Sequence, residues 1–265
     1  EGHQFFGGQI ARLSANGPHN FNINQSSGCA DLGYAVYQFH PGRWDTSGRT
    51  FIEAVPLNIN SAVDDLNQLL QLITCDRSNP ALEVSRRHYR GSLGLIEQNG
   101  QYTFNRVLRE QYLRGVVPQE MPSSWGTLGG GLGMQALQAQ AIAARTYLEA
   151  ISRRRQAKGY MTDTCDTVGC QVYLGASANG MPLDFGTDFW TTTAAVVSTA
   201  ERIRVAYDGS IPLAEFGSSS GGWTTPRAEL SAFPAVVDDG DDIEINPHHL
   251  WEKNIQRSDV ESMYP

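Results

Sequence analysis

Hydrophobic and polar positions alternate, or recur with a helical period, in separate stretches of the chain. Residues 33–44, GYAVYQFHPGRW, alternate aromatic and small side chains and predict a strand that ends at a Pro-Gly turn. Residues 61–73 begin with Ser61, a candidate N-cap, and continue with apolar side chains at helical spacing. This pattern predicts a helix. Residues 76–87 are typical of a linker, so we expect a boundary near residue 86.

The second part of the chain is predicted to mix strands with helices. Alternating residues around Asn-Gly predict a β-hairpin in 88–107. Further along we expect a short helix or turn at 108–117, a flexible glycine run at 127–133, a long helix at 134–152 and a strand-like stretch at 202–217. Strands mixed with few helices, without βαβ alternation, indicate an α+β fold that is rich in strands and has one long central helix.

The long helix predicted at 134–152 has an alanine-rich apolar face with polar edges. The apolar stripe consists of Leu137, Ala141, Ala144, Leu148 and Ile151. Gln138 and Arg145 lie on one flank, and Gln140 and Tyr147 on the other. An arginine among alanines is expected to be part-buried and to need an anionic partner, for which Glu120 is a candidate. An ordinary core helix explains the same spacing.

The overall charge excludes some classes of partner. The 265 residues are 40% hydrophobic and 18% charged, with a formal net charge of −8 and an estimated pI of 5.2. This acidic balance argues against nucleic acid or an anionic membrane as a ligand bound by bulk electrostatics. No stretch approaches the roughly 18 consecutive apolar residues of a transmembrane segment. A start without Met or a signal peptide is typical of a mature exported product, and equally of an artificial boundary.

Four cysteines allow three pairings if all are oxidised. The simplest arrangement joins Cys165 to Cys170 and Cys29 to Cys75. Export favours disulfides, whereas a cytosolic setting favours thiols or a metal site.

Glu120 is placed unusually, in the stretch VVPQEMPSSW at 116–125. Prolines restrict the backbone on both sides of this carboxylate, so we expect it on a stiff loop. It is either a structural cap or a catalyst.

Four segments of the chain follow one another in a characteristic order: YLRGVVPQEMPSSW, MQALQAQAIAARTYL, TDTCDTVGCQVYLGA and AYDGSIPLAEFGSSSGGWT. Together they resemble the stage II sporulation protein D family, bacterial cell-wall enzymes and related domains that act on peptidoglycan, and the resemblance implies that the long central helix lies beside the active-site cleft. The resemblance covers about 88–255. It implies a catalytic domain at 87–265 preceded by an extension of unknown role at 1–86.

The resemblance implies lytic transglycosylase activity without a cofactor, in which the bond between N-acetylmuramic acid and N-acetylglucosamine is cut. The family's catalytic glutamate lies in an EMP motif, which here is Glu120, Met121 and Pro122. One carboxyl group suffices because the muramic acid C6 hydroxyl is the nucleophile and gives a 1,6-anhydro end. Glycosidases of the common type need two carboxyl groups. We expect burial to raise the pKa of Glu120.

The same resemblance implies residues that bind the glycan. They are Arg145, Tyr147 and Gln138 on the long helix, Ser218, Ser219 and Ser220 in a Ser-Gly loop, and the aromatic residues Tyr173 and Tyr207. Arg145 is expected to orient Glu120, to bind substrate, or to pair with a second carboxylate. The serines also fit an ordinary loop, and the tyrosines also fit the core.

Two departures from the family pattern bear on the site. Gln135 and Gln138 replace a Glu and a Lys found in many relatives, which removes two opposite charges. Gly169 replaces a histidine before the second cysteine, which favours a disulfide over zinc. No metal is therefore predicted, although Asp163 or Asp166 remain substitute ligands in a zinc alternative. His248 and His249 are predicted to lie in a solvated loop.

A second hypothesis is a non-catalytic wall-binding or amidase-enhancing module with a cell-wall amidase as partner, because some relatives are described as enhancers. Both hypotheses place the protein outside the cell or on its wall, with peptidoglycan strands as the ligand.

Overall fold

The computed structural model describes only part of the chain. The backbone is described for residues 4–12, 39–40, 51–54, 70–75, 83–97, 101–160, 162–166, 169–178, 181–182, 190–225, 234–244, 246–250, 252, 254 and 256. Within these ranges, side chains are described for 87–91, 104–160, 162–166, 169–176 and from 190 onward. The chain divides into two compact units, Glu1–Arg204 and Val205–Pro265, and each is described by itself.

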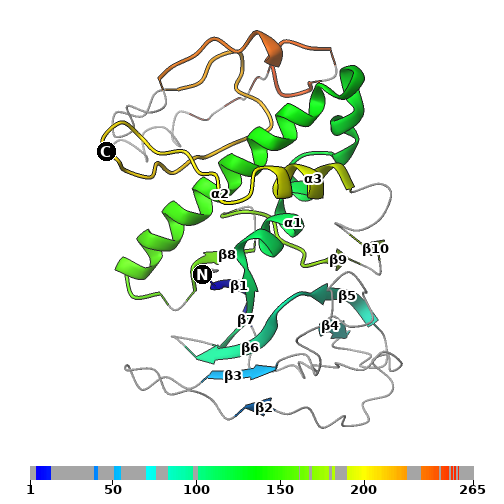
Figure 1. The fold of residues 1–265 in the computed structure, drawn as a ribbon, viewed down its shortest axis with the longest axis vertical. Helices are drawn as coiled ribbons and strands as arrows, with labels where there is room; N and C mark the ends of the chain where they lie inside the picture. The colour runs from blue at the N-terminus through cyan, green and yellow to red at the C-terminus, as the bar shows by residue number, and fades with distance from the viewer. Residues whose placement is uncertain are drawn as a thin grey trace. The chain divides into compact units, whose positions relative to one another are not determined.

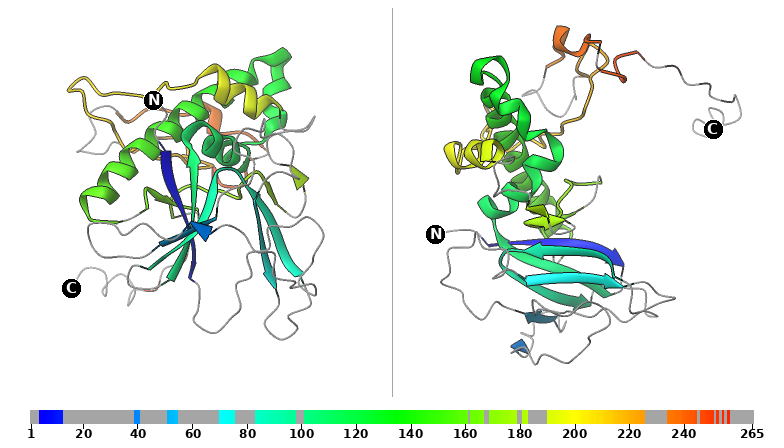
Figure 2. Two further views of the ribbon diagram at one scale, coloured as in Figure 1. Left: turned by 60° about the horizontal axis from the view of Figure 1, so that its bottom comes forward. Right: turned by 90° about the vertical axis from the view of Figure 1, so that its right-hand side faces the viewer.

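The larger sheet of the first unit has six strands in the order β2-β3-β6-β7-β1-β8. Their bounds are β1 Gln4–Arg12, β2 Phe39–His40, β3 Phe51–Ala54, β6 Ser92–Glu97, β7 Gln101–Leu108 and β8 Thr164–Cys165. Neighbouring strands are antiparallel except β1 and β8, which run parallel. Figure 2 shows β1, β6 and β7 side by side.

The hairpin predicted in 88–107 is confirmed. Strands β6 and β7 pair antiparallel from Ser92 with Arg106 to Glu97 with Gln101. The Asn-Gly sequence falls between the paired ends, where a hairpin turn belongs.

The second sheet has the order β10-β9-β5-β4, with bounds β4 Leu70–Cys75, β5 Glu83–Tyr89, β9 Ser177–Ala178 and β10 Met181–Pro182. Strand β4 shows that the helix predicted at 61–73 is wrong for Leu70–Ile73, which pair with β5. A short apolar run such as LLQLI satisfies helical and buried-strand patterns alike, and here the pairing with β5 selects the strand. The rest of the predicted helix, and most of the strand predicted at 33–44, lie outside the described residues.

The boundary expected near residue 86 falls inside strand β5. Strand β1, from the predicted extension, lies between β7 and β8 of the predicted catalytic domain. The linker predicted at 76–87 is therefore wrong for its last residues, which pair with β4. The division into 1–86 and 87–265 stays a prediction about which residues belong to the catalytic domain.

Strand β7 leads directly into the helical part of the first unit (Figure 1). The helices are α1 Arg109–Glu120, the 3-10 helix η2 Ser123–Gly131, α2 Gly133–Ala157 and α3 Trp190–Ser198. Helix α1 extends the short helix predicted at 108–117, and α2 confirms and extends the one predicted at 134–152. The glycine run, predicted to be flexible, forms the kinked end of η2, with positive φ at Gly129, Gly130 and Gly131.

Helix α2 packs against α1, α3 and η2. Its predicted apolar stripe is buried at Leu137, Ala141, Ala144 and Leu148, and half-buried at Ile151. No helix in the described part of the chain combines the length and apolar character of a membrane span.

In the second unit, the strand-like stretch predicted at 202–217 is not a strand. Ala206 and Ser210 instead close a turn through the Ala206 N–H and the Ser210 carbonyl, 2.9 Å apart. Leu213 and Ala214 are both buried, so burial runs along consecutive residues rather than alternating as in a half-buried strand. Trp223 and Val237 form an isolated bridge, and the 3-10 helix η3 spans Asp239–Asp241.

Candidate active site around Glu120

Glu120 is the last residue of helix α1, so the loop predicted around it is wrong. The following residue, Met121, is extended (φ −146°, ψ 129°), while its N–H still donates to the Val117 carbonyl at 3.0 Å. Met121 precedes Pro122, and a residue before proline disfavours the helical conformation. The EMP sequence thus ends the helix directly after its glutamate.

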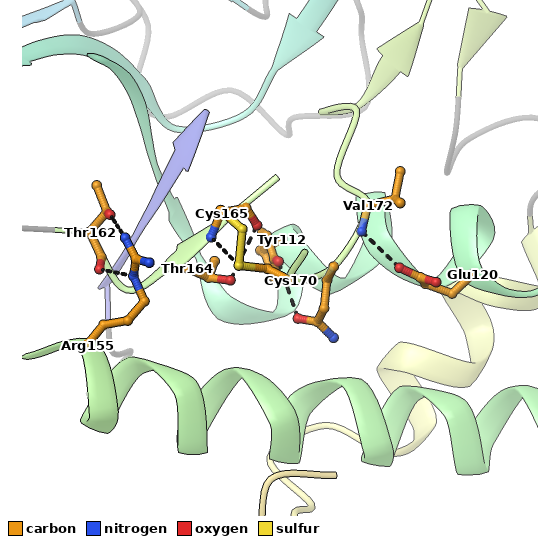
Figure 3. The surroundings of a disulfide bond; sticks show 9 residues. Tyr112, Glu120, Arg155, Thr162, Thr164, Cys165, Cys170 and Val172 are labelled. Carbon is orange, nitrogen blue, oxygen red and sulfur yellow. Dashed lines mark hydrogen bonds between the residues drawn. A yellow bond between two sulfur atoms is a disulfide. The ribbon is translucent and has the colours of Figure 1, made fainter. Parts of the chain in front are cut away.

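The Glu120 carboxylate is half-buried and is held by one hydrogen bond. The backbone N–H of Val172 donates to Oε1 at 2.8 Å (Figure 3). Among the described residues, Glu120 forms no ion pair and no further hydrogen bond. A carboxylate at the C-terminal end of a helix also faces the negative end of the helix dipole, so the helix itself does not stabilise its charge.

Val172 follows a short loop that is closed by a disulfide. Cys165 and Cys170 are bonded, with Cα atoms 5.5 Å apart, which confirms the predicted local pair. Figure 3 shows the disulfide and the Val172–Glu120 hydrogen bond on neighbouring parts of the same stretch of chain. The predicted Cys29–Cys75 pair stays a prediction, because Cys29 lies outside the described residues.

A buried polar network fixes the segment around Val172. The Gln171 side chain donates to the Ala144 carbonyl at 3.1 Å and accepts from the Tyr112 hydroxyl at 3.3 Å. Burial raises the pKa of Tyr112 far above its usual value, so its hydroxyl stays protonated and remains a donor. Burial also raises the pKa of nearby Tyr89 to about 12.

Tyr173 belongs to this buried network. Its ring contacts those of Tyr112 and Tyr89, at centroid distances of 4.8 and 6.1 Å, and its hydroxyl donates to the Asn105 side chain at 2.8 Å. With 3% of its surface exposed, Tyr173 occupies the core. This geometry favours the core alternative over sugar stacking.

Arg145 pairs with Glu110, not with Glu120. Its Nε and Nη2 donate to the two Glu110 carboxylate oxygens at 2.8 and 2.7 Å. Its remaining hydrogen bonds go to the carbonyls of Ala141, Arg202 and Val196.

The expectation that Arg145 orients Glu120 is therefore wrong, and the alternative of a second carboxylate is the one observed. The Arg145 side chain is 0% exposed, and its five N–H donors have five acceptors within the protein. This geometry supports a structural role rather than direct contact with a glycan.

The other predicted residues of helix α2 differ in exposure. Gln138 is half-exposed and donates to the Ser198 hydroxyl at 3.0 Å, so it lies where a ligand can reach it. Tyr147 is buried at 8% exposure.

The predicted serine loop belongs to the second unit, where it is fixed by carboxylates. Ser219 donates to Asp241 at 2.8 Å, the Ser220 N–H donates to the same carboxylate at 2.9 Å, and the Ser220 hydroxyl donates to Asp238 at 2.9 Å. His249 Nδ1 lies 2.9 Å from the Asp241 carboxylate, so this histidine is not merely solvated as predicted. The hydrogen bond to His249, assisted by those from Ser219 and Ser220, lowers the pKa of Asp241 well below its usual value against the opposing effect of burial.

Ser218 and Tyr207 of the second unit are exposed, with Tyr207 entirely accessible. A shared groove formed by Glu120 and the serine loop stays a prediction, because the two belong to different units.

The ligands of the zinc alternative are not assembled in the described part of the chain. Asp163 is buried and accepts hydrogen bonds from Ser152 and Gln156, both at 2.7 Å. The cysteines of the zinc alternative form the disulfide, and no three His, Cys, Asp or Glu side chains gather as a ligand set in the described residues.

The structure adds functional contacts that sequence reasoning missed. The spacing of residues in the sequence does not predict the pairing of Glu110 with Arg145 or of the Val172 amide with Glu120, because tertiary packing brings these partners together. Asp241 and His249 lie in the acidic, histidine-containing stretch after residue 237, where a buried carboxylate supporting the serine loop has no distinguishing pattern.

Comparison with known proteins finds a family match over the part of the chain that carries Glu120. The family model described as "Stage II sporulation protein" matches residues 97–207, which include Glu120, α2 and the disulfide. The matched residues therefore form a domain of the stage II sporulation protein D type. The match ends before the serine loop.

Two relatives illustrate the similarity. The chain is 35% identical to the "Amidase enhancer" of Bacillus subtilis (strain 168) over 127 residues, 47% of this chain and 14% of the relative. It is 31% identical to "Stage II sporulation protein D" of Bacillus amyloliquefaciens over 137 residues, 49% of this chain and 36% of the relative. The chain thus spans well under half the length of either relative. No solved structure gives a significant match.

Proposed function

We propose that this protein is a cell-wall lytic transglycosylase that cleaves peptidoglycan strands with Glu120 as its single general acid and base. The observation that supports this most is the carboxylate of Glu120, set at the end of α1 with one amide donor and with no cationic partner among the described residues. Such a group is accessible and is not neutralised by an ion pair. Peptidoglycan is proposed as the substrate because the surrounding domain resembles the stage II sporulation protein D family.

In the proposed reaction, Glu120 begins as a neutral carboxylic acid. It donates its proton to the glycosidic oxygen as the bond to muramic acid C1 breaks. The carboxylate then takes the proton of the C6 hydroxyl while the C6 oxygen bonds to C1, which closes the 1,6-anhydro ring. Glu120 returns to its starting state. The reaction therefore consumes no water and needs no second carboxyl group.

The test is digestion of purified glycan strands followed by mass spectrometry of the ends. We expect 1,6-anhydro-muramyl ends from the native protein, few or none from Glu120→Gln, and native activity from the control Glu244→Gln, which changes an exposed glutamate of the second unit. Free reducing ends would indicate hydrolysis instead, and cleavage by Glu120→Gln at a rate near that of the native protein would refute the assignment.

A second candidate function is a non-catalytic module that binds the wall and stimulates a cell-wall amidase. The observation in its favour is the 35% identity to a protein named amidase enhancer. Binding to wall without new glycan ends, together with faster peptide release by an added amidase that persists in Glu120→Gln, would select this function. In either case we place the protein at the cell wall.

A further inference from the structure

The hydrogen bond between Val172 and Glu120 gives the two carboxyl oxygens different surroundings. Oε1 accepts the Val172 N–H at 2.8 Å, whereas Oε2 has no hydrogen bond within the described part of the chain. We propose that the backbone amide of Val172 is a positioning group that fixes Oε1 as an acceptor, so that Oε2 is the oxygen that carries and transfers the proton. This inference rests on the function proposed for Glu120.

The chemistry of a carboxyl group supports this division of roles. In the neutral acid, the carbonyl oxygen accepts a hydrogen bond and the other oxygen carries the single O–H donor. An N–H pointing at Oε1 favours the carbonyl at that atom, which leaves the proton on Oε2. That proton passes to the glycosidic oxygen as the C1–O bond breaks, and Oε2 then receives the C6 hydroxyl proton as the C6–O–C1 bond forms. Oε1 keeps its amide donor throughout.

The amide is suited to this role because its segment is anchored on both sides of Val172. On one side, Cys170 is tied to Cys165 by the disulfide, and Gln171 is held by the Ala144 carbonyl and the Tyr112 hydroxyl. On the other side, the Ala176 N–H donates to the His88 carbonyl at 2.7 Å. The segment that carries the Val172 amide is therefore held by contacts on both sides of this residue.

Two glycines let this segment lie close to helix α1 and strand β5. A Cβ on Gly115 of α1 would stand 2.4 Å from the Gly175 carbonyl oxygen and 2.7 Å from the Tyr173 ring. Gly175 has φ +80°, and a Cβ there would stand 2.2 Å from the His88 carbonyl oxygen. Backbone in such contact cannot move toward α1 or β5, so the distance from the Val172 amide to the end of α1 is set by packing.

The direct test replaces the Val172 amide by an ester, using the α-hydroxy analogue of valine, which deletes the N–H and keeps the side chain. Loss of a hydrogen bond to a charged group predicts a kcat about 10- to 100-fold lower. The carboxylate also loses a stabilising donor, so the alkaline limb of the pH–rate profile should move to higher pH. The matched control Val172→Ala keeps the N–H and should leave that limb in place.

A second measurement needs no backbone change. The amide ¹H resonance of Val172 should move as the pH is varied through the titration of its acceptor in the native protein, and should not move with it in Glu120→Gln. A native Val172 resonance that does not titrate, or an ester variant with the pH profile of Val172→Ala, would overturn the proposal. If the ester variant had a lower kcat at all pH values but an alkaline limb at the native position, the effect would be structural only, and the proposal for the Val172 amide would again be overturned.

These outcomes are separable from failure of the proposed function. If Glu120→Gln still cleaves glycan strands at a rate near that of the native protein, the general acid is another group and the proposed function fails. If Glu120→Gln is inactive while the ester variant keeps the native rate and profile, the function stands and only the role of Val172 is rejected.

Discussion

Helix α1 carries a glutamate near each end, and the two are held in opposite ways. Glu110 lies in the first turn, where both of its oxygens accept hydrogen bonds from buried Arg145. Glu120 is the last residue, and the backbone amide of Val172 is its one hydrogen-bond donor among the described residues. The same side chain is thus paired with a cation at one end of the helix and left accessible at the other.

The helix dipole makes this difference informative. Its positive end favours an acid in the first turn, and its negative end disfavours one in the last. Glu110 follows that rule and Glu120 departs from it. Departures from local stability rules are expected at functional sites, so the comparison fits a structural role for Glu110 and the catalytic role proposed for Glu120.

The largest expected effect separates the two glutamates by activity. Glu120→Gln removes the proton donor and should lower the rate of glycan cleavage by about 10²- to 10⁴-fold, the usual contribution of general acid–base catalysis. Glu110→Gln, assayed well below its unfolding temperature, should keep most of the activity per folded molecule. Cleavage rates normalised to folded protein by circular dichroism check this. Equal losses in both variants would remove the distinction.

The next effect concerns stability. Arg145→Met leaves Glu110 without its cation, and because the Glu110 side chain is 34% exposed the loss in the free energy of unfolding should stay at about 3 kcal/mol, the low end for breaking a buried ion pair. The control is Arg153→Ala, which breaks the Arg153–Glu149 pair on the same helix. Arg153 is 65% exposed, so this loss should stay below about 0.5 kcal/mol. Urea unfolding measures both. In the double variant Arg145→Met/Glu110→Gln, part of the stability should return.

A smaller effect concerns the support of Glu120. Replacing Cys165 and Cys170 together by serine opens the short loop and should lower the free energy of unfolding by about 2 kcal/mol, by the chain-entropy relation. Activity should fall as well, because the segment bearing the Val172 amide loses one anchor. Unfolding of the native protein with and without reductant gives an independent check. Identical stability in the oxidised and reduced states would contradict the prediction.

The smallest effect extends the comparison to a third carboxylate, Asp241. Its folded-state pKa is lowered, first by the hydrogen bond to His249, so its stabilising contribution is present above the unfolded value of about 3.9 and is lost as the pH falls through the folded pKa. Asp241→Asn should therefore be less stable than the native protein near neutral pH, and this difference should shrink under strong acid. Asp239→Asn, at an exposed position of the same 3-10 helix, is the control. Thermal unfolding against pH measures the difference.

Much of the local structure around the site was predictable. The spacing of apolar residues predicted α2, and the Asn-Gly turn predicted the β6–β7 hairpin. The four-segment resemblance singled out Glu120, and the loss of a histidine before Cys170 predicted the disulfide that is observed. These features depend on neighbours a few residues apart, and for that reason pattern reasoning reached them. The α+β class and the glycan-binding roles stay predictions.

The errors occurred where local patterns were ambiguous. The run LLQLI fits a helix or a strand, and pairing with β5 decided for a strand. The stretch at 202–217 alternates in part, yet no strand among the described residues pairs with it, and it contains a turn at 206–210 instead. Arg145 was expected to pair with Glu120 but pairs with Glu110. Sequence patterns alone do not say which of the two glutamates of α1 faces Arg145, because that depends on how α1 packs on α2.

By itself, the sequence determined that Met121 disfavours the helical conformation, since it precedes Pro122, although the same rule at Pro118 did not stop α1 before Glu120. It also determined the apolar face of α2 and the short distance between Cys165 and Cys170. Only the tertiary structure decided which acid receives Arg145, 35 residues away, and which amide reaches Glu120, 52 residues away. Contacts across such separations depend on how helices and strands pack, and local preferences do not specify them.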